Sequence, residues 1–390
     1  FEPNLNGIFL LVQGAVLDWP APEPTVLADL NPHLDYTTAT VSQRTRDESI
    51  GDPRAVAVDG TGRIFIAGMG SNNVVVHDAS LTRLDRVEVG EGPTGLMLDG
   101  DRLYVLNRFE ASISTIDTTS MTETDRVFMH DATPSEIRLG RPFLYDTHRT
   151  SGLGHVSCGS CHIDARMDQV AWDLGDPQGE VKPFNQVCNF GLGGCQDWHP
   201  MKGPMTTQTL VGIAGTEPFH WRGDREDLAA FNGAFESLLG DDTQLTNEEM
   251  DAFTAFVATL TPPPNPFRHI DGSLPTSVPG SGNAVVGEVL FNTAGLDGVE
   301  CVTCHAFPSG TNGELTSAPL LGAAQSMKIP SFETCMRRPA SIKRPTRTTE
   351  ALVSCMTATS THCSTSSSSR ASSSTAALQV ISSARTSSRS

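Results

Sequence analysis

Short apolar runs separated by polar turns dominate the chain between residues 52 and 132. The runs recur: the segment 53–59 and the two runs that follow it have counterparts 40 residues later, beginning at Pro93. Val, Ile and Leu fill these runs, and Asp-Gly pairs stand in the turns. Short β-rich runs at this period are typical of β-propeller blades. We therefore predict a partial β-propeller in residues 1–132, with an isolated β-meander as the alternative.

After residue 132 the spacing of apolar residues becomes helical. Residues 246–249 (Thr-Asn-Glu-Glu) match a capping box, in which the Thr hydroxyl and the second Glu carboxylate satisfy first-turn N–H groups. The apolar residues that follow share one helical face: Met250, Phe253, Phe256, Val257 and Leu260. Three prolines at 262–264 then end this helix.

The helical part holds two copies of the pattern Cys-x-x-Cys-His. They are formed by Cys158, Cys161 and His162, and by Cys301, Cys304 and His305. Two thiols one helical turn apart can each form a thioether with a haem vinyl group, and the following His can bind the iron. A thiol redox pair or half of a zinc site is the alternative for a single copy. Two complete copies favour two covalently bound c-type haems.

These patterns predict a multidomain chain: an all-β partial propeller followed by all-α cytochrome c-type domains. The first cytochrome domain is expected at 133–262, a linker at 263–279, and a second, truncated cytochrome domain at 280–330. A helix and loop precede both Cys-x-x-Cys-His motifs, as expected at the start of a cytochrome c domain.

The charge of the chain narrows its function class and its partners. The formal net charge is −18, which argues against binding to nucleic acid or to anionic membrane surfaces.

No apolar run is long enough to span a bilayer. The chain begins at Phe1, without an initiator Met or a secretory segment, so we expect an N-terminal truncation. Covalent haem implies export, to the periplasm or the cell exterior.

Two further cysteines, Cys188 and Cys195, flank a Gly-rich stretch between the two motifs. In an exported protein this spacing favours a disulfide that closes a short loop. A pair of reduced cysteines is the alternative.

The last 60 residues differ from the rest of the chain. Residues 331–390 are crowded with Ser, Thr and Arg, and hold eight Lys or Arg but only two Asp or Glu. A disordered Ser-rich tail is one interpretation. The other is a shifted frame after Pro330, because synonymous codons for residues 331–343, read one base earlier, give QLRNLYEKTGFDK. The continuation gives FMHDGDVDTL, which aligns with residues 219–228 and shares Phe, Gly, Asp and Leu.

Residues 146–175, which include the first haem motif, resemble the di-haem cytochrome c peroxidase/MauG family. The stretch 199–224, with Phe-His-Trp-Arg-Gly-Asp at its end, is similar to the same family. Tyr-Val-Leu-Asn at 104–107 approximates the YVTN-type propeller repeat that some members carry. The resemblance implies one haem that stores an electron and another that meets peroxide or a protein substrate. It also implies Trp221 as a bridge between them.

The sequence leaves the identity of the distal iron ligands undecided. His162 and His305 are the expected proximal ligands. Candidates for the sixth position at the first haem are His199, Met201, Met205 and His220, with Met250 as a poorer one because it lies on a helix core face. Ordinary packing is the alternative for each of them, and for Trp221. The Asn-Pro-x-Glu-Met segment that carries a distal carboxylate in the family is absent here, and neither Glu236 nor Asp241 matches its pattern.

Two functions follow from these observations. The first is an oxidoreductase that takes electrons from a donor protein or small cytochrome to reduce hydrogen peroxide, or that oxidises a partner. The second is a non-catalytic di-haem electron-transfer protein that uses the propeller as a docking module. As written, with its present tail, the chain is expected to hold the second haem poorly.

Overall fold

A computed structural model of the chain describes residues 8–17, 26–188, 194–276, 283–293, 299–332 and 377–386. The chain forms two compact units that are not continuous in sequence. The first unit contains residues 1–163, 232–256 and 361–390, and the second contains 164–231 and 257–360.

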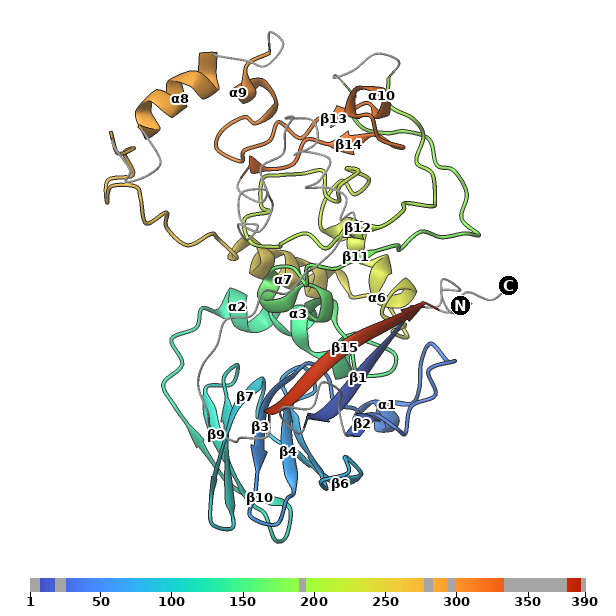
Figure 1. Cartoon of the computed structure of the whole chain (residues 1–390), viewed down its shortest axis with the longest axis vertical. Helices are drawn as coiled ribbons and strands as arrows, with labels where there is room; N and C mark the ends of the chain where they lie inside the picture. Colours follow the sequence, from blue (N-terminus) through green and yellow to red (C-terminus); the bar gives the residue numbers. More distant parts are fainter. Residues whose placement is uncertain are drawn as a thin grey trace. The chain divides into compact units, whose positions relative to one another are not determined.

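Two four-stranded antiparallel sheets occupy the repeat region of the first unit (Figure 1). Sheet 1 has the order β3-β4-β5-β6, with bounds β3 Pro53–Val58, β4 Ile64–Gly68, β5 Asn73–His77 and β6 Arg83–Glu88. Sheet 2 has the order β10-β9-β8-β7, with bounds β7 Pro93–Asp99, β8 Arg102–Asn107, β9 Ser112–Asp117 and β10 Thr122–Phe128. The two sheets confirm the two predicted β-repeats.

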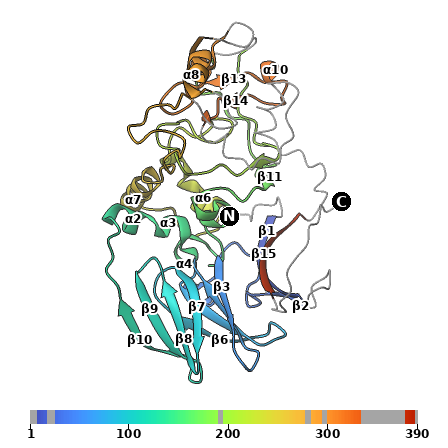
Figure 2. The same cartoon turned by 60° about the vertical axis from the view of Figure 1, so that its left-hand side comes forward.

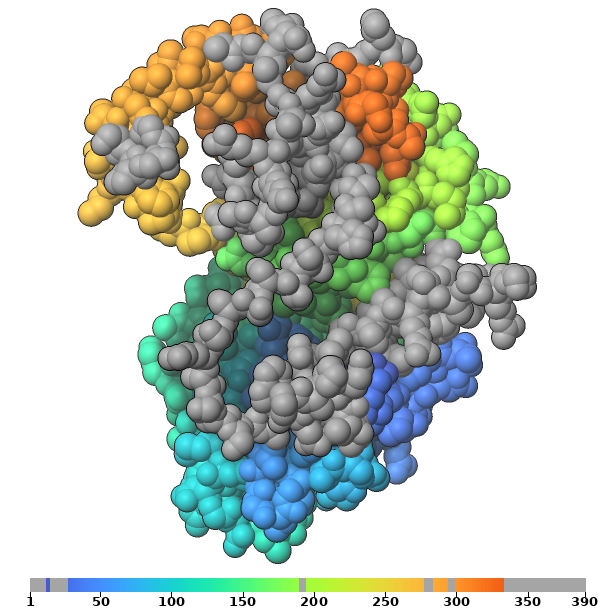
Figure 3. All heavy atoms as spheres, in the orientation of Figure 1, coloured from blue at the N-terminus to red at the C-terminus, as the bar shows by residue number. Residues whose placement is uncertain are grey.

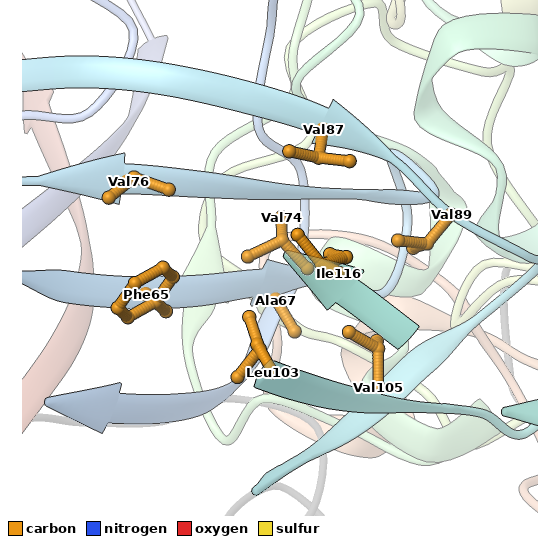
Figure 4. Close-up of a cluster of buried hydrophobic side chains, with 9 residues drawn as sticks. All are labelled: Phe65, Ala67, Val74, Val76, Val87, Val89, Leu103, Val105 and Ile116. Atoms are coloured by element: carbon orange, nitrogen blue, oxygen red, sulfur yellow. The ribbon is translucent and has the colours of Figure 1, made fainter. Parts of the chain in front are cut away.

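The two sheets pack face to face around one apolar cluster. Figure 4 shows its side chains converging from both sheets: Phe65, Ala67, Val74, Val76, Val87, Val89, Leu103, Val105 and Ile116. Along β8, Leu103 and Val105 are fully buried, whereas Leu106 is 41% exposed. This alternation follows from the two-residue period of a strand, which sends successive side chains to opposite faces.

A third sheet, of order β15-β1-β2, covers the other face of sheet 1. Its strands are β1 Ile8–Leu17, β2 Val26–Asp29 and β15 Ala377–Thr386, and Figure 2 shows β15 beside β1. Val12, Leu30 and Ile50 pack here against residues of sheet 1: Ile64, Ile66 and Val75. Sheet 1 is thus buried on both faces. The remainder of the expected disordered, frame-shifted tail, residues 333–376 and 387–390, lies outside the described residues.

Short helices complete the first unit. They are α1 Gln43–Arg46, α2 Ser135–Gly140, α3 Pro142–Tyr145, α4 Thr147–Thr150, α5 Cys158–Cys161, α6 Gly233–Ser237 and the beginning of α7 Asn247–Ala258. The capping box of α7 is confirmed, because Thr246 N donates to Glu249 Oε2 and Glu249 N donates to Thr246 Oγ1. Phe253 of α7 packs on Phe143 and Phe235.

The second unit contains little regular structure. Its helices are η1 Ile163–Ala165 (from its second residue), η2 Ala229–Phe231, α8 Ala284–Thr293, α9 Cys301–Cys304 and α10 Ala318–Leu321. Its strands are β11 Ala171–Trp172, β12 Met205–Thr206, β13 Leu315–Thr316 and β14 Met327–Lys328, paired as β11-β12 and β13-β14. The Cys188–Cys195 disulfide is present, which confirms that prediction.

The prediction of all-α cytochrome domains is wrong. The described residues are organised mainly by antiparallel sheets, and both haem motifs lie on helices of only four residues. The described part of 166–228 holds no helix. The reason is local: this stretch is rich in Gly and Pro, which disfavour the helix interior. The predicted boundaries at 133–262 and 280–330 stay predictions. None of the described helices is long and apolar enough to cross a membrane.

Candidate haem-binding sites

The first Cys-x-x-Cys-His motif folds as a single helical turn, α5. His162 N donates to Cys158 O at 2.9 Å, and Ser157 N donates to the Ser160 hydroxyl at 3.0 Å, which fixes the start of the turn. This spacing places the thiols of Cys158 and Cys161 close to one side of the turn. Neither thiol is in a disulfide. Burial raises the pKa of the Cys158 thiol to about 11, whereas a reactive redox thiol has a lowered pKa.

The second motif has the same backbone turn. Helix α9 spans Cys301–Cys304, and His305 N donates to Cys301 O at 2.9 Å. Cys301 and Cys304 are also outside any disulfide. Burial raises the pKa of Cys304, with a contribution from the nearby Glu314. The two copies therefore share one local geometry in spite of lying in different units.

The imidazole of His305 is held in a defined orientation. Its Nδ1 lies 3.1 Å from Gly310 O, a carbonyl that can only accept, so Nδ1 carries the proton. The edge of the Phe332 ring packs against the same imidazole at 5.0 Å between centroids. Nε2 is left as the nitrogen able to bind iron, because a ligating His usually donates its other N–H to a carbonyl or carboxylate. Two thiols and this imidazole fit a c-type haem.

A short hairpin connects the second motif with the segment around Trp221. Asn312 N donates to Cys304 O at 2.9 Å, and β13 follows directly. Its partner strand β14 then reaches Trp221, because Lys328 N donates to Trp221 O at 2.8 Å. The backbone positions of His305 and Trp221 are therefore linked through the β13-β14 hairpin within one unit.

Trp221 is a packed residue in this structure. Its side chain is 9% exposed, and its Nε1 donates to Thr206 O at 2.7 Å. It forms a small apolar cluster with Met327, Met205 and Leu321. These contacts fix the indole firmly, and its role as an electron bridge stays a prediction.

Four of the predicted distal ligands of the first haem, His199, Met201, Met205 and His220, belong to the second unit. His199 is exposed, and its Nδ1 accepts from Met201 N at 3.1 Å. Met201 is 40% exposed, whereas Met205 packs on Trp221. The role of each of these residues as an iron ligand stays a prediction. Met250 is 5% exposed and belongs to the buried face of α7, as its place in the helical pattern suggested.

His220 has a polar environment that the sequence analysis missed. Its Nδ1 lies 2.8 Å from Asp224 Oδ1, and Arg222 Nη2 donates to Asp224 Oδ2 at 2.9 Å. Burial alone would raise the pKa of Asp224. The contacts with His220 and Arg222, together with the nearby Lys202, hold that pKa far below its usual range. Burial lowers the pKa of His220. In the sequence, the four-residue spacing between His220 and Asp224 was the signal from which their contact could have been predicted.

The described residues contain no group of three or more His, Cys, Asp or Glu side chains placed to hold a metal ion. For each haem, the chain would supply two thioether bonds and one proximal imidazole.

No protein-family model and no curated protein matches this chain. Among solved structures, a hydrazine synthase of Kuenenia stuttgartiensis under xenon pressure is 19% identical, covering 48% of this chain and 55% of that one, with a TM-score of 0.33. A second structure of that enzyme is 23% identical, covering 21% of this chain and 25% of that one, with a TM-score of 0.21. The dihydro-haem d1 dehydrogenase NirN is 16% identical, covering 34% and 26%, at 0.22. With TM-scores this low, these similarities carry no conclusion about activity.

Proposed function

We propose that this chain is a di-haem c-type oxidoreductase whose two haems are attached at Cys158/Cys161 and at Cys301/Cys304. The observation that carries the proposal is the matched local geometry of the two motifs. Each presents two thiols outside any disulfide on one helical turn, followed at once by a His. In the second motif the hydrogen bond from His305 Nδ1 to Gly310 O leaves Nε2 for the iron.

The resemblance to the di-haem peroxidase family supports a peroxidase-like activity. A bound c-type haem supplies one-electron redox chemistry, and hydrogen peroxide or an oxidisable partner is the substrate class. The chain's own residues hold the haem covalently, orient the proximal imidazole and, in Trp221, offer an aromatic side chain for electron transfer between the two haems.

An exported location is part of the proposal. The Cys188–Cys195 disulfide supports it, because disulfides persist in the periplasm and outside the cell. The electron donor would be a protein or small cytochrome that meets the chain there.

A non-catalytic electron-transfer protein is the second candidate, and the state of two carboxylates favours it. Asp241 forms a partly buried ion pair with Arg46 at 3.0 Å, and Glu236 Oε2 accepts a hydrogen bond from Gln244. Both belong to the first unit. The ion pair with Arg46 keeps the Asp241 carboxylate from acting as the proton shuttle that peroxide cleavage needs. Glu236 does not match the family's pattern for that group.

The haem content of cysteine variants tests the proposed function. The full chain is expressed with a signal peptide and a c-type maturation system, and its haem is measured after denaturation. Cys158→Ala with Cys161→Ala should remove about one haem, and Cys301→Ala with Cys304→Ala the other. Cys188→Ala with Cys195→Ala is the matched control and should keep both haems. Full haem content in either motif variant would refute the assignment.

Optical and redox titrations then separate the two candidate functions. A haem with an open or weakly bound sixth position that reacts with peroxide supports the enzyme, and two inert six-coordinate haems support the carrier. The measurement is made on the chain as written and on a version with the reading frame restored after Pro330. If the frame hypothesis holds, only the restored version should show coupled two-haem behaviour.

A further inference from the structure

Three cations surround one buried carboxylate in the second unit. Asp224 is 5% exposed, and its Oδ2 lies 2.9 Å from Arg222 Nη2, 3.6 Å from Arg225 Nη1 and 4.0 Å from Lys202 Nζ. Arg222 is itself 5% exposed at its side chain. One carboxylate balances one of these charges. The group therefore keeps an excess of positive charge in a chain whose formal net charge is −18.

Two donors of this group have no hydrogen-bond acceptor in the part of the chain that the structure describes. Arg222 Nε is buried and unpaired, although Nη1 of the same guanidinium donates to His199 O at 2.7 Å and Nη2 donates to Asp224. Lys202 Nζ makes no hydrogen bond either, since its contact with Asp224 at 4.0 Å is too long for one. Arg222 is buried, so its unpaired Nε–H costs free energy, whereas the Lys202 side chain is 23% exposed and water can reach it.

The surroundings hold these cations in place. Trp198 packs over the Arg222 guanidinium, at 5.7 Å from its ring centroid, and Gln325 accepts from Arg222 Nη1 at 3.3 Å. Gln325 also donates to the backbone carbonyl of Lys202. A planar guanidinium fixed on an aromatic face and by backbone acceptors loses little side-chain entropy when it binds an anion.

We propose that Lys202, Arg222 and Arg225 form a binding site for a carboxylate group. Asp224 is the internal counter-charge that keeps the three cations together when the site holds no ligand. A carboxylate has two oxygens, which can accept hydrogen bonds from a guanidinium and from an ammonium group at the same time.

The carboxylate has two chemical sources. It is either a free carboxylate anion or a propionate of a haem attached to this chain, and the second source rests on the proposed function.

Calorimetric titration of the full chain with succinate tests the site. The chain is used in its haem-loaded form and as a haem-free form with all four motif cysteines changed to Ala. Ionic strength is held constant with sodium chloride. Saturable binding to the haem-free form is expected. If succinate binds the haem-loaded form as tightly as the haem-free form, the ligand is a free anion. If succinate binds only the haem-free form, a haem propionate occupies the site in the loaded form.

Three variants separate a carboxylate site from a structural ion cluster. Lys202→Met should weaken succinate binding at least tenfold, whereas Asp224→Asn, which removes the competing carboxylate, should strengthen it severalfold. Arg268→Gln changes an exposed cation of the same unit and should leave binding unchanged. Circular dichroism checks that each variant is folded.

The proposal is overturned if the haem-free chain shows no saturable binding, or if Asp224→Asn weakens binding. Equal weakening by Lys202→Met and Arg268→Gln would also overturn it, since that result describes non-specific attraction. A chain that attaches no haem refutes the proposed function but leaves the test on the haem-free form intact.

Discussion

The ring of Tyr145 lies directly against the backbone of Gly159, inside the first haem motif. A Cβ atom on Gly159 would stand 2.7 Å from Tyr145 Cδ1 and 3.0 Å from the carbonyl oxygen of Leu144. The second motif has Val302 at the matching position. The first copy thus needs a glycine because α3 packs on α5, and not because a haem requires one there.

Gly159→Val should therefore damage the first motif only. Overpacking of this kind typically lowers the free energy of unfolding by about 1–3 kcal/mol, and a displaced α5 should reduce haem attachment at Cys158 and Cys161. Urea unfolding and haem content are the measurements. The matched control is Val302→Gly, which removes a side chain at the matching position of the second motif and therefore creates no clash. An unchanged unfolding midpoint for Gly159→Val would contradict the observed packing.

A second prediction concerns the carbonyl group that holds His305. Gly310 has a φ of 71°, and its oxygen accepts from both His305 Nδ1 and Phe332 N, at 3.1 and 3.0 Å. A Cβ on Gly310 would meet Phe332 N at 2.8 Å. Gly310→Ala should therefore displace this acceptor and make the imidazole a weaker electron donor.

The midpoint potential of the second haem should rise in Gly310→Ala. A hydrogen bond worth about 1 kcal/mol corresponds to about 40 mV for a one-electron couple, and spectroelectrochemical titration measures it. Gly322→Ala is the matched control: Gly322 also has a positive φ of 61°, but a Cβ there meets nothing within 4 Å. Equal potentials in Gly310→Ala and wild type would show that the contact has no influence on the iron.

The third prediction is a pH dependence set by His77. This residue is fully buried in β5, and neither ring nitrogen has a hydrogen-bond partner among the described residues. Burial, together with Arg83, lowers its pKa to about 4. The folded state therefore holds the neutral imidazole, and the unfolded state takes up a proton below its ordinary pKa of about 6.5.

The free energy of unfolding of the first unit should fall as the pH decreases from about 6.5 to about 4, by up to about 3 kcal/mol from this residue. His77→Leu should flatten that dependence, though not abolish it, since burial also lowers the pKa of His33. Urea unfolding at several pH values measures the effect. His269→Gln, at an exposed position, should leave the slope as it is.

A fourth prediction compares two leucines on β8. Leu103 is fully buried between the sheets, and Leu106 faces away from sheet 1 with 41% of its surface exposed. Leu103→Ala should cost about 2–5 kcal/mol of unfolding free energy, and Leu106→Ala about 0.5 kcal/mol or less. The outer face of sheet 2 also exposes Met97 and Val127. Figure 3 shows part of the surface of sheet 2, in cyan to teal. A large cost for Leu106→Ala would mean that this face is covered.

The sequence by itself was enough for features that depend on near neighbours in the chain. Apolar runs that recur at a 40-residue period predicted the two β-repeats and three strands of each sheet, because short runs of β-forming residues between Asp-Gly turns specify strands locally. Thr246 and Glu249 predicted the start of α7, and Cys188 and Cys195 their disulfide, since each pair needs only local chain geometry.

Tertiary structure decided what depends on distant partners. The all-α prediction failed because a Cys-x-x-Cys-His motif requires one helical turn and says nothing about the Gly- and Pro-rich loops beside it. The requirement for Gly159 came from Tyr145 on another helix. The excess charge around Asp224 arises because the folded unit places Lys202, 22 positions earlier in the chain, near the carboxylate that Arg222 also binds. Burial creates such sites, and burial is not visible in local sequence.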